Sequence, residues 1–462
     1  KVLRVSDDDY WKDFPRELRT PTLRLLQTDL QLGRGFGDWQ TYARIERWQV
    51  LQTTDPTTRI DPPYERLPQV GLRYSAPTFG FDVALESEIN RFADPDDRYL
   101  LSRQTGTRAH VLGSLSRGFG THGWTLTPKL GFNAASYAVD RPLADGSRNA
   151  SRVIPTLSVD SAWTLEREAS FFGRRVVQTL EPRLFYVNTP YRRQLDLPNF
   201  DAFARDFNFD SLFTENAFTG IDRVSDSHAL SAGVTSRVLD PVSGVEALRF
   251  GIAQRYRFRD QRVTPDGQPQ DQHFSDIVVF GSTTLLQRWN FDMSVQYNPD
   301  DRRVERSLAG VRYSPGPYRT VGLNYRLTRG LSEQVELGWQ WPLFGEVPGG
   351  ERRAASPGTG GRCGGTLYSV GRVNYSVRDA RLTDSIVGFE YDAGCWIGRI
   401  VAERLSTGRS EATTRLLVQL ELVGLSRLGS NPLKVLKDNI PGYQLLREER
   451  ATNTPFTPYE YQ

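Results

Sequence analysis

The chain has 462 residues, of which 38% are hydrophobic and 24% are charged, with 58 Lys and Arg against 55 Asp and Glu. No apolar run approaches the roughly 18 residues that a membrane-spanning helix needs, while an aromatic content of 11% is too high for a disordered chain. The net charge of only +3 argues against sequence-independent nucleic-acid binding, which needs clustered basic residues. Insertion into a membrane by strands stays open, because such a strand needs only about ten alternating residues.

Alternation of apolar and polar residues at period two is the dominant pattern along the chain. In residues 320–328, for example, Val321, Leu323, Tyr325 and Leu327 lie on one face of the predicted strand and polar residues or glycine on the other. Spacing typical of amphipathic helices is nearly absent, and the stretch 433–438 is too short to predict a helix. The other clear alternating segments are 291–298, 335–341, 372–377 and 416–422, and clusters of turn residues lie at 144–147, 265–267, 298–301 and 314–317.

A soluble β-sandwich would show the same alternation. Here, however, the polar faces carry charged or amide side chains strand after strand, the apolar faces end in aromatic residues, and short turns alternate with long polar loops. This combination is typical of an outer-membrane barrel. We therefore predict an all-β fold, a large antiparallel transmembrane β-barrel over residues 1–429, followed by an irregular C-terminal tail over residues 430–462 that contains four prolines.

Several sequence blocks, in order along most of the chain, resemble the LptD family of lipopolysaccharide-assembly outer-membrane proteins. One of the most specific is the run GFEYDAGCW at 388–396. The resemblance implies a barrel of about 26 strands in the complete family, of which we expect about 20 here, with the first strands and a periplasmic jellyroll domain outside this chain. The other blocks lie at 5–14, 152–160, 172–186, 190–194, 197–201, 218–226, 233–237 and 422–427.

The same resemblance implies a function in the outer membrane of a Gram-negative bacterium. The expected protein is a translocon, not an enzyme, that inserts lipopolysaccharide into the outer leaflet and uses no cofactor. The headgroup would pass through the lumen, and the lipid tails would leave through a lateral gate that involves the last strand. Its expected partners are an LptE-type plug lipoprotein in the lumen and a periplasmic lipopolysaccharide bridge that reaches it through the jellyroll. The gate residues would be Leu416, Val418, Leu420 and Leu422.

A second hypothesis from a different class is a passive porin or receptor channel of similar strand number. A porin would conduct ions without a plug, whereas the translocon would need a stoichiometric partner in its lumen. Neither hypothesis includes a nucleic-acid partner.

Arginines on the polar faces are candidate contacts for phosphorylated headgroups, because a guanidinium matches phosphate geometry and stays charged. The alternative is that each arginine pairs with a carboxylate of the barrel wall, and Glu181 beside Arg183 is the pair that we expect on one strand. The candidates are Arg183, Arg249, Arg255, Arg326 and Arg372.

Cys395 lies in a short connection between two alternating segments, which predicts a place at the end of the barrel with short turns, the periplasmic end. The resemblance implies that Cys395 forms a disulfide with the jellyroll. Cys363 lies in a Gly- and Pro-rich insertion at 346–365, and it would be a substitute for a lost neighbouring cysteine or a local partner of Cys395. Two free thiols are the third alternative.

The segment 197–224 is too long for a turn, and the resemblance implies an extracellular loop that folds over or into the lumen; a solvated, mobile loop is the alternative. No catalytic residues and no metal site are predicted. The four histidines lie far apart without metal-ligand spacing, and no Gly-x-Ser-x-Gly motif is present.

Overall fold

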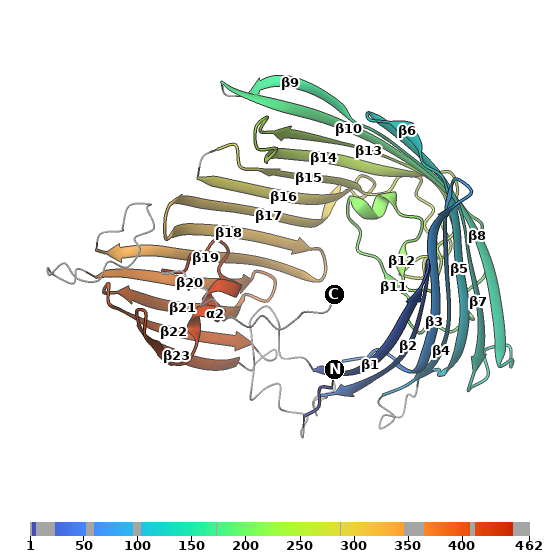
Figure 1. The fold of residues 1–462 in the computed structure, drawn as a ribbon, viewed down its shortest axis with the longest axis horizontal. Helices are drawn as coiled ribbons and strands as arrows, with labels where there is room; N and C mark the ends of the chain where they lie inside the picture. The colour runs from blue at the N-terminus through green and yellow to red at the C-terminus, as the bar shows by residue number, and fades with distance from the viewer. Residues whose placement is uncertain are drawn as a thin grey trace.

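The computed structural model describes residues 2–5, 24–51, 60–95, 103–171, 173–286, 288–345, 365–406 and 412–446. Strands of this part of the chain form one 22-stranded antiparallel sheet (Figure 1). Its first half contains β1 (Leu25–Phe36), β2 (Trp39–Val50), β3 (Glu65–Thr78), β4 (Phe81–Ala93), β5 (Gly106–Ser116), β6 (Phe119–Thr121), β7 (Trp124–Val139), β8 (Asn149–Trp163), β9 (Leu165–Phe171), β10 (Arg174–Thr189) and β13 (Ser227–Leu239). Its second half contains β14 (Glu246–Arg257), β15 (Ile277–Thr283), β16 (Trp289–Asn298), β17 (Arg303–Gly316), β18 (Arg319–Thr328), β19 (Ser332–Phe344), β20 (Thr366–Ser376), β21 (Arg381–Asp392), β22 (Trp396–Ser406), β23 (Ala412–Leu422) and β24 (Ser426–Gly429).

Each long strand pairs with the next long strand along the chain, as in an up-and-down barrel. The short strand β6 continues β5 along β7, and β9 continues β8 along β10. Counting each of these two interrupted strands once gives 22 − 2 = 20 strands, which agrees with the predicted number. The all-β, antiparallel fold class is confirmed. The sheet curls into a C shape with β1 at one end and β23 with the short strand β24 at the other (Figure 1). No pairing of described residues joins β1 to β23 or β24.

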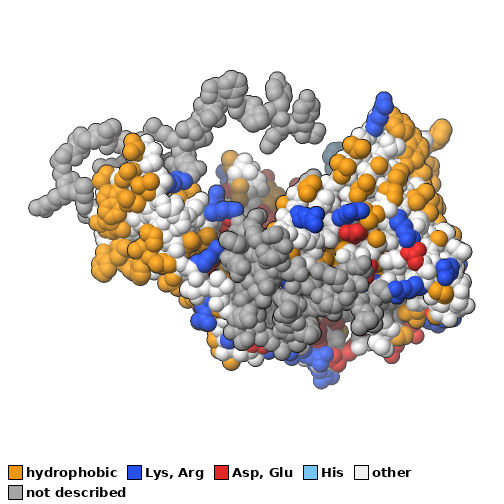
Figure 2. All heavy atoms as spheres, turned by 90° about the horizontal axis from the view of Figure 1, so that it is seen from below, with side chains coloured by type: hydrophobic (Ala, Val, Ile, Leu, Met, Phe, Trp, Pro, Cys, Tyr) orange, Lys and Arg blue, Asp and Glu red, His pale blue; other side chains and the backbone are white. Residues whose placement is uncertain are grey.

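The two faces of the sheet differ in polarity as the alternation predicted. Large apolar side chains such as Leu323, Leu337 and Ile400 are exposed on the convex face, where hydrophobic atoms cover much of the outer walls (Figure 2). Side chains such as Gln340 and Glu390 are buried on the concave face. An apolar exterior around a polar interior is the arrangement of transmembrane barrels. Among the described residues, no helix is long and apolar enough to cross a membrane.

Short turns gather at one end of the sheet, here called the short-turn end. The connections β1–β2, β3–β4 and β17–β18 each contain two residues there, and β21–β22 contains three. In the turn between β3 and β4, Phe79 and Gly80 have φ of 52° and 79°, as a two-residue hairpin turn that matches strand twist requires. At the opposite end, the long connections all lie between strands that precede β16. The connections β16–β17, β18–β19 and β20–β21 at that end are short.

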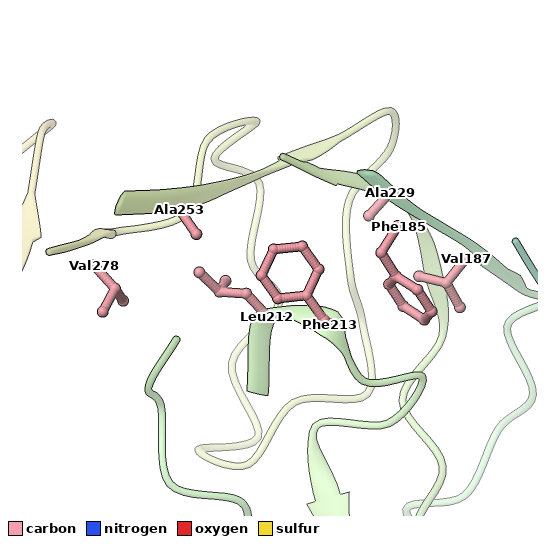
Figure 3. Close-up of a cluster of buried hydrophobic side chains, with 7 residues drawn as sticks. All are labelled: Phe185, Val187, Leu212, Phe213, Ala229, Ala253 and Val278. Carbon is pink, nitrogen blue, oxygen red and sulfur yellow. The ribbon is translucent and has the colours of Figure 1, made fainter. Parts of the chain in front are cut away.

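The long connection between β10 and β13, residues 190–226, folds into the concave side of the sheet and is called the luminal loop below (Figure 1). It contains the two-residue strands β11 (Phe203–Ala204) and β12 (Phe218–Thr219) and the short 3-10 helix η2 (Asp210–Phe213). Leu212 and Phe213 of η2 lie in a buried cluster with side chains of β10, β13, β14 and β15 (Figure 3). Phe200 packs against a second cluster that includes Tyr64, Phe92 and Tyr137. The loop therefore lies on the concave face, as the prediction of a loop that folds over or into the lumen requires, and its extracellular position stays a prediction.

The segment after β24 departs from the prediction of an irregular tail. Residues Pro432–Asn439 form the helix α2, and Val435, Leu436 and Ile440 pack on the concave face against Val370, Ile386 and Val401. So short a helix is unstable alone, and contact with the wall stabilises it. The spacing of Leu433 and Leu436 was a correct local sign of a helix, but only the sheet provides the apolar surface that they need. The domain boundary at 429/430 stays a prediction.

Candidate functional site on the concave face

The luminal loop is fixed to the wall through a buried group of charges around Arg108 of β5. The Arg108 guanidinium lies 2.8 Å from Asp201 and 2.9 Å from Asp222, both in the loop, and only 1% of its side chain is exposed. Tyr137 of β7 donates a hydrogen bond of 2.9 Å to Asp222 Oδ1. Buried charges are tolerated when they are paired and hydrogen-bonded, so this network supports one docked position of the loop.

The pKa values of the two loop carboxylates shift in opposite directions. Burial raises the pKa of Asp201, but the hydrogen bond and charge of Arg108 outweigh it and hold this pKa at about 2. Burial raises the pKa of Asp222 above its ordinary value, against the attraction of Arg108. Asp222 Oδ2 also accepts hydrogen bonds from the backbone N–H groups of Phe200 and Asp201. Arg108 is therefore the shared partner of both loop carboxylates.

Two further contacts hold the loop at η2 and directly after it. Arg255, one of the predicted headgroup contacts, donates to Ser231 Oγ at 2.9 Å and to the carbonyl oxygens of Leu212 and Thr214. Glu215 accepts a hydrogen bond of 2.6 Å from Ser158 and pairs with Lys129 at 3.2 Å. Arg255 thus supports the loop directly, a contact that the sequence did not predict.

The predicted pair of Glu181 with Arg183 is wrong. Arg183 pairs with Asp160 on β8 at 2.6 Å, and Glu181 pairs with Arg237 on β13 at 3.2 Å. Neither partner lies directly across the ladder, because Arg183 is opposite Ala162 and Glu181 is opposite Thr235. Both ion pairs are diagonal contacts between neighbouring strands, at a spacing of about 7–8 Å that long side chains can bridge.

The remaining three candidate arginines differ in how accessible they are. Arg372 is buried between Glu336 at 2.7 Å and Asp384 at 3.1 Å, and the Arg249 guanidinium lies 5.2 Å from the centre of the Phe280 ring. Arg326 lies 3.8 Å from Glu336, and 48% of its side chain is exposed. The alternative role in the wall thus fits Arg183 and Arg372, and Arg326 presents its charge to the interior.

The predicted last strand corresponds to β23, but it is not the last strand of the sheet. β24 pairs with residues Gln419–Leu422 of β23, and the Ser430 hydroxyl and backbone extend this contact to Val418. The outer edge of β23 is therefore covered near the short-turn end and has no strand partner over residues 412–417 in the described part of the chain. Leu416, Val418 and Leu420 are exposed on the apolar face, and Leu422 is partly buried.

Cys395 is exposed in the three-residue connection between β21 and β22, at the short-turn end as predicted, and no disulfide of the described residues includes it. Cys363 lies outside the described residues. The disulfide prediction is therefore not tested here.

A group of potential metal ligands lies on the concave face, although the sequence analysis predicted none. Glu86 and Glu88 of β4 and His110 of β5 each bring a ligand atom within 4.8 Å of the others. Spacing along the chain does not reveal this group, because two strands, β4 and β5, form it together.

Comparisons with known proteins agree with this architecture. A family profile described as "LptD: LPS transport system D" matches residues 1–344. An LPS-assembly protein LptD of Polaromonas sp. is 48% identical over 465 residues, which cover 99% of this chain and 56% of that protein. The chain belongs to the LptD family. An LptD of Albidiferax ferrireducens is also 48% identical, over 99% of this chain and 57% of its own length.

This LptD-family chain thus spans a little over half the length of the relatives that it matches. A solved structure of the siderophore receptor PirA from Acinetobacter baumannii aligns with 86% of the chain and 71% of the receptor, at 7% identity and a TM-score of 0.34, which is too low to support an argument. Family membership and the apolar convex face give the location as the outer membrane of a Gram-negative bacterium. The role named for the family is LPS transport, which is not an enzymatic reaction.

Proposed function

We propose that the protein containing this chain inserts lipopolysaccharide into the outer leaflet, with the headgroup moving through the lumen and the lipid tails leaving at the edge of β23. Family membership supports the substrate class. The opposite polarity of the two faces supports separate routes, because a charged headgroup is stable in the polar interior and acyl chains are stable against the apolar exterior.

The position of the proposed gate rests on the unequal pairing of β23 with its two neighbouring strands. β23 forms eleven residue pairs with β22 but only four with β24. Separation of β23 from β24 therefore breaks fewer backbone hydrogen bonds than separation of β23 from β22. The apolar side chains of Leu416, Val418 and Leu420 line the convex face beside this edge, where acyl chains would enter the membrane.

The proposed partners follow from the same scheme. Lipopolysaccharide would arrive from a periplasmic bridge through a jellyroll domain, and an LptE-type lipoprotein would occupy the lumen. Arg326 is the candidate headgroup contact that the structure supports best, because nearly half of its side chain is accessible and its pairing with Glu336 is long. Phosphate can compete for such a guanidinium more easily than for buried Arg372.

Photocrosslinking in the full-length protein in cells tests both routes. A photoreactive residue replaces Arg326 for the lumen or Leu416 for the edge, and Leu130, exposed on the convex face of β7, serves as the lipid-facing control. We expect lipopolysaccharide adducts at positions 326 and 416 that disappear when lipopolysaccharide synthesis stops, whereas adducts at 130 persist. Lack of supply-dependent adducts at 326 would contradict the headgroup route, and their absence at 416 would contradict this gate.

We further propose that Cys395 forms the disulfide to the jellyroll. Its exposure at the short-turn end supports this pairing, since that end is periplasmic in such barrels. Peptide mass mapping of the full-length protein without reductant should find Cys395 linked to a jellyroll peptide, and Cys395→Ser should remove the link. Linkage of Cys395 to Cys363, or two unlinked thiols, would overturn this pairing.

A further inference from the structure

Three side chains on the concave face converge between β4 and β5. Glu86 and Glu88 lie two residues apart on the same face of β4, and His110 is the direct ladder partner of Glu88 on β5. One ligand atom from each residue lies within 4.8 Å of the other two. Two carboxylates and one imidazole are ligands that Zn²⁺ and other divalent transition metals accept.

The hydrogen bonds of Glu88 orient this residue as a metal ligand. Its Oε2 accepts hydrogen bonds from Gln69 at 2.5 Å and from the Tyr42 hydroxyl at 2.7 Å. Its Oε1 lies toward His110, 4.0 Å from Nδ1, and has only longer contacts, with Asn90 Nδ2 at 3.4 Å and Arg108 at 3.6 Å. Neighbours thus hold one oxygen and leave the other directed at the imidazole, which is how outer groups usually position a ligating carboxylate.

His110 provides the independent observation. Only 2% of its surface is exposed, and neither ring nitrogen has a hydrogen-bond partner among the described residues. The distance of 4.0 Å to Glu88 is too long for a hydrogen bond. A buried polar atom without a hydrogen-bond partner costs free energy of folding. An imidazole without partners beside two carboxylates therefore points to a bound cation that all three side chains contact.

The positive charges nearby do not prevent cation binding. Arg108 has its close ionic contacts with Asp201 and Asp222 of the luminal loop. Arg73 contacts only Oε1 of Glu86, at 3.3 Å, and this pair is partly exposed. We propose that Glu86, Glu88 and His110 bind one divalent transition metal, with Zn²⁺ as the matching ion. The ion would join β4 to β5 beside the anchor of the luminal loop.

The test measures Zn²⁺ binding to the full-length protein, purified with its partners and stripped by a chelator. Competition with a fluorescent zinc indicator should show that the wild type binds one Zn²⁺ ion per protein tightly. His110→Ala and Glu86→Gln should lose this binding. Tyr42→Phe should weaken it about 10- to 100-fold, because this hydroxyl only orients Glu88. His122→Ala, which removes an exposed histidine of a turn, is the matched control and should bind as the wild type does.

Glu86→Gln keeps the test decisive if His110→Ala fails to assemble, since the Glu86 side chain is partly exposed. X-ray absorption at the zinc edge should show one nitrogen ligand with oxygen ligands in the wild type. Absence of a tight equivalent in the wild type, or an equal affinity in Glu86→Gln and wild type, would overturn the site.

Discussion

Arg108 is the residue whose loss should affect the luminal loop most. Arg108→Met would leave Asp201 and Asp222 buried without their ionic partner, which costs about 3–5 kcal/mol for a broken buried pair. We expect the loop to leave the wall and proteases to cleave it within residues 190–226. Arg193→Met removes an exposed ion pair with Asp196 in the same loop and should leave cleavage unchanged. Equal protection of both variants would show that the other contacts of the loop hold it without Arg108.

Arg372 and Arg326 contact the same carboxylate but should differ in their effect on stability. Arg372→Ala leaves buried Glu336 and Asp384 without their closest cation, so the barrel should unfold at a markedly lower temperature. Arg326→Ala removes a longer, half-exposed contact and should change stability by at most about 1 kcal/mol. The temperature at which the folded band disappears on semi-native gels measures both. Similar midpoints for the two variants would contradict the assignment of Arg372 to the wall.

For single residues, the sequence predicts which face of the sheet a side chain lies on, but not its ion-pair partner. The alternation places Arg183 and Arg372 on the polar face correctly, because side-chain direction along a strand is a local property. Their partners depend on register with other strands. Arg183 meets Asp160, 23 residues away, and Arg108 meets Asp201, 93 residues away. No local pattern contains such pairings, and for the same reason His110 and the two glutamates of β4 were not predicted to meet.

Among the elements, α2 should depend on its contact with the wall. Leu436 is fully buried against side chains of β20, β21 and β22, so Leu436→Ala should cost about 2–5 kcal/mol, more than a helix of eight residues can tolerate. An endoprotease specific for lysine would then cleave after Lys434 or Lys437, while the wild type resists. Leu428→Ala, on exposed β24, is the matched control and should resist as well. Resistance of Leu436→Ala would show that the other buried side chains, Val435 and Ile440, hold the helix without Leu436.

The elements also show where prediction from the sequence stopped. Alternating segments identified strands because each strand reports its own two faces, and β16, β18 and β19 match them closely. α2 and β24 are short, and their stability comes from the sheet surface that they contact. Segments of eight or four residues are therefore too short for a sequence pattern to predict the element, although the spacing of Leu433 and Leu436 is consistent with a helix.

For the whole molecule, the proposed translocon function predicts a stoichiometric partner in the lumen. A barrel that contains a sheet of about 20 strands encloses a lumen wider than wall side chains can fill. The luminal loop packs on β10 and β13–β15, and α2 packs on β20–β22, so each covers its own part of the concave face. Extraction of the full-length protein in mild detergent, followed by intact mass measurement, should therefore show a one-to-one complex with a lipidated partner. A barrel that copurifies alone and conducts ions in planar bilayers would favour the passive channel instead, because an open lumen of this width conducts whereas a plugged one does not.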